Sequence, residues 1–263
     1  MVRPTTKSEQ PGEGDSPSSA RPTRREQIRQ MTVEDIKAAA HEQLTQQSAG
    51  NVSLRAVARE VGLAPSAIYR YFESQTALVA AVAVDAYHSA SQALGAARQR
   101  TRSCPARDQL EAVFTAYRRW ALDNPAEFKL IFATDQSLLT VGPGGLPSAT
   151  LHEFFATPVQ IFVEGIANGQ VDTGRAVLQL EARLTPEMEE VRATLLGLGD
   201  RSLSDHQIAV LLSAWCSVQG FVALEVFGQL GWFVVNPDEL FAAHVRGVLS
   251  AAGMLTPEDP AAG

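Results

Sequence analysis

Residues 53–72 combine helix caps, apolar spacing and one glycine in a way that permits little except two short helices joined by a tight turn. Ser53 can cap the first helix, because its side-chain oxygen can accept an unpaired backbone N–H of the first turn. Gly62 can end that helix in a left-handed conformation, and Pro65 suits the first position of the next one, where its missing N–H would be unpaired anyway. The expected buried side consists of apolar residues at helical spacing: Leu54, Val57, Ala58 and Val61 in the first helix, and Ile68 and Phe72 in the second.

The second of these helices is expected to be about two turns long. Its outward side would carry small residues first and tyrosine and arginine next. A short helix of that kind suits insertion into the major groove of DNA. The residues expected to face outward are Pro65, Ser66, Tyr69, Arg70 and Tyr71.

The run VGLAPSAIYRYF, residues 61–72, resembles the helix-turn-helix of the TetR family of transcriptional repressors, and its Tyr-x-x-Phe ending is the most telling part. The resemblance is specific over residues 32–80 and architectural beyond them. The chain departs from the family pattern at two positions. Ala64 replaces a Ser or Thr helix cap, which should weaken the helix start by about 0.5–2 kcal/mol. Gln75 replaces a lysine that contacts phosphate, which should remove one such contact.

The resemblance implies roles for the remaining residues of this segment. It assigns Ser53, Tyr69 and Tyr71 to phosphate contacts, and it places Ala64, Pro65, Ser66 and Arg70 at or near base edges. Arg55 stands where family members touch a guanine or a phosphate, although it can also be read as a solvated charge. Because polar base readers are few, we expect sequence preference to depend on Arg55, Ser66, Arg70 and DNA shape.

Four arginines, at positions 21, 24, 25 and 29, precede the segment. They are interpreted either as an arm that reaches phosphates or the minor groove, with Arg24 and Arg25 as its DNA contacts, or as the solvated start of a helix. The net charge is −7, but residues 1–75 hold 10 Lys/Arg and 9 Asp/Glu, so most of the acidity lies beyond them. This distribution fits a protein that presents only its N-terminal part to DNA.

The rest of the chain predicts an all-α fold, with the helix-turn-helix joined to a helical ligand-binding and dimerisation domain. We expect a disordered tail over 1–22, a DNA-binding domain over 23–77, an effector-binding and dimerisation domain over 78–255, and a flexible end over 256–263. Helices are predicted from their caps and apolar spacing. They are expected over 33–48 after Thr32, from Ser74 to Arg100, and over 106–123, 125–133, 148–168, 186–197, 204–228 and 236–252.

Aromatic residues are numerous in the C-terminal part, where each is either core or pocket lining. By the family resemblance they surround a cavity for a small, mostly apolar effector, whose identity the sequence does not give. Tyr117, Trp120, Trp215 and Gln219 have polar ends that could orient it. The candidate ligand-binding residues are Phe114, Tyr117, Trp120, Phe128, Phe132, Phe155, Phe162, Trp215 and Gln219.

The last two predicted helices carry small residues that would allow two helices to approach closely. The resemblance implies that they form a four-helix interface in a homodimer, and the alternative is an internal helix pair. Candidate interface residues are Ser213, Ala214, Ser217, Phe221, Phe241, Val245 and Val248. A dimer would read two half-sites about 34–36 Å apart, or a multiple of that, and hence a near-palindromic operator.

Other classes of protein find less support in the sequence. The five histidines lack metal-ligand spacing and no nucleophile motif is present, so neither an enzyme, a metal site nor a cofactor is expected. Cys104 and Cys216 suggest free thiols in a reducing cytoplasm. We expect no membrane-spanning run. A helical interaction module that does not bind DNA is the remaining alternative, and the arginines beside Tyr69 and Tyr71 argue against it.

Overall fold

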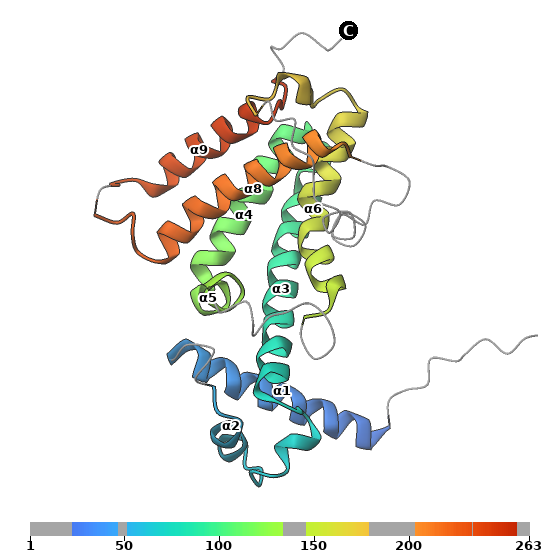
Figure 1. Ribbon diagram of the computed structural model, residues 1–263, viewed down its shortest axis with the longest axis vertical. Helices are drawn as coiled ribbons and strands as arrows, with labels where there is room; N and C mark the ends of the chain where they lie inside the picture. Colours follow the sequence, from blue (N-terminus) through green and yellow to red (C-terminus); the bar gives the residue numbers. More distant parts are fainter. Residues whose placement is uncertain (1–22, 47–51, 134–145, 179–202, 233, 257–263) are drawn as a thin grey trace, which may run out of the picture.

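The computed structural model describes residues 23–46, 52–133, 146–178, 203–232 and 234–256. Within these ranges the fold is all-α and contains no strand, as the sequence predicts. An isolated antiparallel bridge joins Val171 to Met254. In Figure 1 a small head, formed by residues 23–46 and 52–77, lies below a larger helical body, formed by the described residues from 78 onward. The helical elements are α1 (Arg24–Gln46), α2 (Leu54–Glu60), η2 (Ile68–Arg70), α3 (Gln75–Arg100), α4 (Ala106–Asp123), α5 (Pro125–Ala133), α6 (Ser148–Ala167), η4 (Thr173–Arg175), α8 (Asp205–Val226) and α9 (Pro237–Ala251).

Most helix starts in the body lie where the caps predict them. The Ser74 side chain accepts the Ala77 N–H at the start of α3. Ser204 and Gln207 form a reciprocal capping box at the start of α8. Asn236 caps α9, whose first residue is a proline. Each of these contacts satisfies backbone groups that a helix end leaves unpaired.

The predicted start of the first helix is wrong. Thr32 lies inside α1, where its hydroxyl donates to the Ile28 carbonyl at 2.9 Å instead of capping a helix end. The capping box stands nine residues earlier: the Thr23 N–H donates to a Glu26 carboxylate oxygen at 2.6 Å, and the Glu26 N–H donates to the Thr23 hydroxyl at 3.3 Å. The motif Thr-x-x-Glu at 23–26 makes a better capping box than Thr32 with Asp35. The side chain of glutamate is long enough to reach back to the N–H of the cap residue, and that of aspartate is shorter.

The second helix of the helix-turn-helix is also shorter than predicted. Residues 65–67 form turns, and only Ile68–Arg70 are helical, as a 3₁₀-helix without a side-chain cap. The Ala67 N–H donates to the Ala64 carbonyl at 2.8 Å, and the Tyr71 N–H to the Ile68 carbonyl at 2.9 Å. Neither Ala64 nor Ala67, the residue at the N-cap of this 3₁₀-helix, has a side chain that can accept an N–H group, and the backbone closes tighter three-residue bonds instead.

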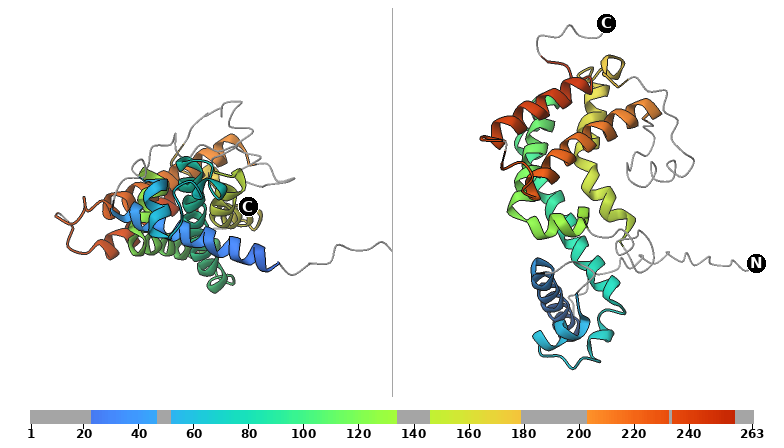
Figure 2. Two further views of the ribbon diagram at one scale, coloured as in Figure 1. Left: turned by 90° about the horizontal axis from the view of Figure 1, so that it is seen from below. Right: turned by 60° about the vertical axis from the view of Figure 1, so that its left-hand side comes forward.

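Helix α3 belongs to both parts of the molecule. It packs on α1 in the head and on α4, α5 and α6 in the body (Figures 1 and 2). Leu78, Val82 and Leu94 are buried along its length, and one continuous hydrophobic core joins head and body. The expected domain boundary at residue 77 therefore falls within a continuous helix.

Some expectations fall outside the described residues: the disordered tail over 1–22, the helix over 186–197 and the end of the chain from residue 257. The expectation about membrane spans needs a correction. Helix α8 is long and apolar enough, by length and composition alone, to cross a membrane. Only 22% of its most apolar stretch is buried in the protomer. Most of the other residues of α8 are half-buried, and five of them are exposed in the protomer.

Candidate DNA-binding surface and effector cavity

The turn of the helix-turn-helix is fixed by Gly62. Its φ of 71° lies in the left-handed region that glycine occupies without strain. The Leu63 N–H donates to the Ala58 carbonyl at 2.8 Å, and the Gly62 N–H donates to the Arg59 carbonyl at 3.2 Å. This pair of bonds is the Schellman motif, which satisfies the last carbonyls of α2 and reverses the chain.

After the turn, two buried side chains hold the segment against the head. Ile68 is fully buried and Phe72 is 8% exposed, as the sequence predicts. The side chains between and before them face solvent. Ala64, Pro65, Ser66, Tyr69 and Arg70 are all exposed. The segment therefore presents two small residues, a hydroxyl, a phenol and a guanidinium on an open surface.

Residues at the starts of α2 and α3 adjoin this surface. The Ser53 hydroxyl accepts the Ala56 N–H at 3.4 Å, and the Ser53 N–H donates to the Gln43 side chain at 3.2 Å. Arg55 is exposed in the first turn of α2. Gln75, the first residue of α3, is half-buried. Ser53 is thus held by its own helix, while the Arg55 guanidinium faces solvent.

Three of the four N-terminal arginines, at positions 24, 25 and 29, lie on helix α1 and not on an extended arm, and Arg21 lies outside the described residues. Arg24 and Arg25 are exposed in the first turn of α1, and Arg29 follows one turn later. The Arg29 guanidinium lies 5.7 Å from the centre of the Tyr71 ring, a cation–π contact. Tyr71 is half-buried and packs against the hydrophobic core, so it faces outward only in part. This contact places Arg29 of α1 beside the outward segment, where its guanidinium adds positive charge.

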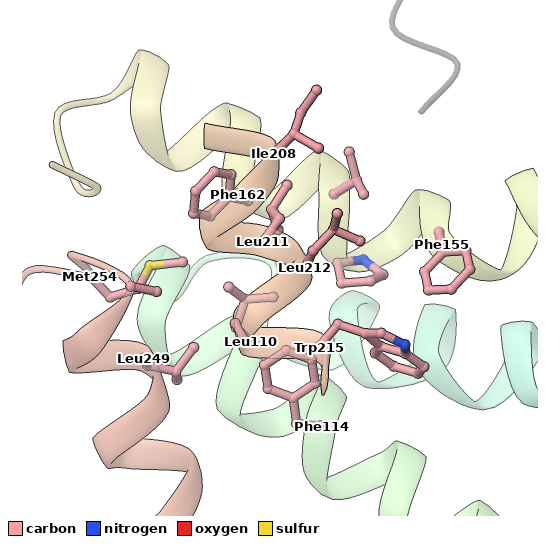
Figure 3. Close-up of a pocket in the computed structure, with 14 residues that line it drawn as sticks. Leu110, Phe114, Phe155, Phe162, Ile208, Leu211, Leu212, Trp215, Leu249 and Met254 are labelled. Carbon is pink, nitrogen blue, oxygen red and sulfur yellow. The ribbon is translucent and has the colours of Figure 1, made fainter. Parts of the chain in front are cut away.

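The body contains a cavity of about 130 Å³ among α4, α6, α8 and the end of α9 (Figure 3). Among the described residues that line it, no side chain is charged, and the indole of Trp215 carries the one side-chain N–H group. The lining residues are Leu110, Phe114, Phe155, Pro158, Val159, Phe162, Ile208, Leu211, Leu212, Ala214, Trp215, Leu249, Ala252 and Met254. Such a wall offers contact area and almost no hydrogen bonding.

Four of the nine candidate ligand-binding residues line this cavity: Phe114, Phe155, Phe162 and Trp215. The other five do not: Tyr117, Trp120, Phe128, Phe132 and Gln219. The polar groups of Tyr117, Trp120 and Gln219 form hydrogen bonds within the protein. The Tyr117 hydroxyl donates to the Gln219 side chain, and the Trp120 indole donates to the Ser89 hydroxyl at 3.2 Å. Burial raises the pKa of Tyr117 well above its ordinary value, so the phenol stays protonated.

The four aromatic residues among these five, Tyr117, Trp120, Phe128 and Phe132, instead form an aromatic cluster with Trp215 of the cavity wall. The Tyr117 and Phe128 side chains are fully buried. The Trp215 ring, which belongs to both cavity and cluster, lies 5.1 Å from the Tyr117 ring and 6.3 Å from the Phe132 ring. The aliphatic part of the cavity wall was not predicted from the sequence. The sequence signal that could have identified this wall is the helical spacing of Ile208, Leu211, Leu212 and Trp215, which places one face of α8 on the cavity.

The candidate interface residues divide between the interior and the outer face of α8 and α9. Phe241 and Val245 are buried within the protomer, where Phe241 packs on Phe221 with ring centres 5.2 Å apart. Ala214 lines the cavity wall, and Ser217 and Val248 are half-buried. Ser213 is exposed. The exposed row of α8 consists of Leu212, Cys216, Gly220 and Leu224, spaced four residues apart and uncharged, and Leu212 also lines the cavity.

Comparisons with known proteins agree with this architecture. Residues 36–82 match the family model of tetR-family bacterial regulatory proteins, and residues 110–248 match the tetracyclin repressor-like C-terminal domain. The HTH-type transcriptional regulators Rv1816 of Mycobacterium tuberculosis and Mb1846 of Mycobacterium bovis are each 30% identical over 226 residues, covering 84% of this chain and 91% of theirs.

Solved structures agree on the fold. The crystal structure of the regulatory protein SCO4313 has a TM-score of 0.62 and 26% identity, and the alignment covers 87% of this chain and 100% of the other. A tetR-family transcription regulator from Shewanella sp. PV-4 has a TM-score of 0.55 and 13% identity, with 85% and 98% covered.

A helix-turn-helix head on a helical body with an internal cavity defines a DNA-binding transcriptional regulator, not an enzyme. The chain belongs to the TetR family.

Proposed function

We propose that this regulator is a repressor that binds a near-palindromic operator as a homodimer and is released by a small apolar effector. The observation that carries the DNA-binding part is the open surface of Ser66, Tyr69 and Arg70, anchored from beneath by buried Ile68 and Phe72. Phosphate contacts would set its register, and Arg55, Ser66 and Arg70 would read bases. Repression is inferred from the family alone.

Selection of bound duplexes from a random pool at near-physiological salt tests the DNA-binding proposal. We expect the protein to enrich a palindromic site. Arg55→Ala should then lose about 1–3 kcal/mol of discrimination at one base pair per half-site. Arg119→Ala, which removes an exposed arginine from α4 in the body, is the matched control and should keep the preference of the parent. Unchanged preference in Arg55→Ala would assign the reading to other residues.

The dimer proposal rests on the outer row of α8. Leu212 and Leu224 are each 43% exposed, and Cys216 and Gly220 between them are also exposed. On α9, Leu240 is 44% exposed and Gly247 is open to solvent. Uncharged rows of this kind on two neighbouring helices suit a two-fold, four-helix contact, in which small residues let the backbones approach.

Gly220→Glu should convert the dimer to a monomer. A side chain at Gly220 meets nothing within 4 Å in the protomer, and glutamate favours a helix more than glycine does, so the protomer should keep its fold. The new carboxylate would instead be buried unpaired against the partner subunit. Sedimentation velocity measures the outcome. Gly95→Glu on α3, also open, is the control and should remain dimeric.

The cavity defines the class of effector. A dry cavity of about 150 Å³ lined by Leu, Ile and Phe binds benzene. The present cavity is about 130 Å³ and has a similar wall. An uncharged hydrocarbon group of about one ring would fill it, whereas a carboxylate would lose its hydration without gaining a partner. We therefore propose an uncharged, apolar effector, or the apolar end of a longer one.

Thermal unfolding with added arenes tests this class. Toluene should raise the unfolding midpoint, by the equivalent of roughly 2.7 kcal/mol at a concentration of about 100 times Kd. Benzoate should not. Ala252→Leu places a larger side chain in the cavity wall and should abolish the effect of toluene, while Ala96→Leu on the exposed side of α3 should preserve it. Equal stabilisation by benzoate would contradict the proposed class.

The proposed switch is a population shift. Filling the cavity would favour one packing of α4, α6, α8 and α9, and release follows if that packing misplaces the two heads for successive grooves. Helix α3 is the proposed lever, since it packs on both head and body.

A further inference from the structure

One side-chain contact joins the head directly to a helix of the body that carries no part of the DNA-binding surface. The imidazole Nε2 of His41, on α1, lies 2.8 Å from a carboxylate oxygen of Glu127, on α5. A carboxylate only accepts, so the imidazole N–H donates. The two side chains are 36% and 21% exposed, so the contact is partly screened from water. It therefore ties the head to α5 at a partly desolvated position.

Helix α5 has a second attachment, which leads towards the cavity. Phe128, the residue after Glu127, is fully buried. Its ring lies 5.0 Å from the Phe132 ring, which lies 6.3 Å from the ring of Trp215 in the cavity wall. One helix of nine residues thus touches the head through Glu127 and the aromatic cluster through Phe128. A displacement of the cluster can reach the head without passing along α3.

The head is held on α3 by a separate contact. The Lys37 ammonium lies 2.7 Å from an Asp85 carboxylate oxygen and 3.0 Å from one of Glu34. Burial lowers the pKa of Lys37, but its two carboxylate partners outweigh burial and raise the pKa overall, so the ammonium stays charged. This contact joins α1 to α3, a helix that continues from head to body, and does not involve α5. The contact between His41 and Glu127 instead senses where α5 lies relative to α1.

We propose that His41 and Glu127 are positioning residues that set the angle of the head on the body, and that α5 passes the state of the cavity to the head through them. The first half of this inference concerns geometry alone. The second half rests on the proposed function, since it requires a head that binds DNA and a body that binds an effector. Coupling between two sites is established by measuring both ends. The distances and affinities below are therefore measured with and without toluene, the probe for the cavity, and we expect toluene to change both in the parent protein and neither in Glu127→Ala or His41→Ala.

The chain supplies a matched control. His88 on α3 and Glu153 on α6 form a second histidine–glutamate contact of 2.9 Å, between side chains that are 56% and 51% exposed. Both residues belong to the body. Glu153→Ala therefore removes the same chemical contact without touching the head.

The head–body distance is measured between two nitroxide labels by pulsed electron resonance. Labels are placed at Glu60→Cys in the head and Ala167→Cys in the body, both exposed, with Cys104 and Cys216 replaced by serine. Labelled protein is diluted into unlabelled protein, so that distances within one chain dominate. We expect one narrow distribution in the parent, in Glu153→Ala and in Glu127→Gln, whose amide oxygen can still accept the imidazole N–H.

Glu127→Ala and His41→Ala should each broaden or shift the distribution, and the double variant should be no worse than either single one. On the selected duplex, both single variants should bind the full palindrome on the order of tenfold more weakly while keeping parent affinity for one half-site. A head that is merely destabilised would lose both.

Parent-like distances in both alanine variants would overturn the inference, as would equal changes in Glu153→Ala. If the alanine variants change the head–body distance but the parent protein enriches no duplex, the positioning role stands and the proposed function is wrong. If the alanine variants change the head–body distance but keep the parent affinity for the full palindrome, His41 and Glu127 set only the angle of the head, and the proposed coupling is wrong.

Discussion

Replacing Arg118 by alanine is expected to lower the free energy of unfolding by about 3–5 kcal/mol, as found when one partner of a buried ion pair is removed. The Arg118 guanidinium donates two bonds of 2.6 Å to the Glu225 carboxylate, and the two side chains are only 10% and 12% exposed. Alanine would leave Glu225 buried without this partner. Chemical denaturation at fixed protein concentration measures the change.

The loss should be large because Arg118 joins three helices. It extends from α4 to Glu225 on α8, lies 2.7 Å from an Asp238 carboxylate oxygen at the start of α9, and stacks 5.1 Å from the centre of the Phe241 ring. Hydrogen bonding to Glu225 raises the pKa of Arg118 above its ordinary value although burial opposes it. The guanidinium therefore stays charged at every pH at which the protein is folded.

A double replacement separates the unpaired charge from lost packing. Arg118→Met with Glu225→Leu removes both charges and retains much of the apolar volume, so most of the stability should return. If the double variant is as unstable as Arg118→Ala, the loss arises from packing on Phe241 and not from an unpaired carboxylate.

Gly253→Ala is expected to cost about 2–5 kcal/mol, the second large effect. Gly253 follows α9 with a φ of 81°, which costs a residue with a Cβ about 1–2 kcal/mol. A Cβ there would also lie 2.1 Å from the backbone oxygen of Asp172, and relieving such a clash typically costs a further 1–3 kcal/mol. The Asp172 N–H donates to the Gly253 carbonyl at 2.9 Å, so the two segments cannot separate without losing that bond.

Gly228→Ala isolates the backbone part of this cost. Gly228 follows α8 with a φ of 71°, but a Cβ there meets nothing within 4 Å. The Gly228→Ala variant should lose only about 1–2 kcal/mol of unfolding free energy. Similar losses in the two variants, measured by denaturation, would contradict the clash between Gly253 and Asp172.

The sequence predicts those features that depend on neighbours along the chain. The caps at Ser74, Ser204 and Asn236 are local, because each side chain bonds a backbone group three residues away. Gly62 and the buried pair Ile68 and Phe72 are predicted for the same reason. The 3₁₀ geometry after Pro65 is harder to predict, since it reflects the lack of a capping side chain at Ala64.

The cavity depends on how distant helices meet, and the local pattern does not determine that. Tyr117 and Gln219 are 102 residues apart and bond to each other, and neither lines the cavity. Aromatic residues are equally suited to a core and to a pocket wall, and only the packing of α4, α5, α6 and α8 assigns Phe128 to one and Phe155 to the other. Aliphatic residues such as Leu211 carry no chemical signal of a pocket at all.

The continuity of α3 has a consequence for building chimeric regulators. A graft that joins one regulator's head to another's body at residue 77 would separate Leu78 and Val82 from the head residues they pack against, and Asp85 from Lys37. The transferable unit therefore ends beyond Asp85. Since α1 also bonds α5 through Glu127, a grafted head would need a compatible acceptor on its new body to stand at the angle of the old one.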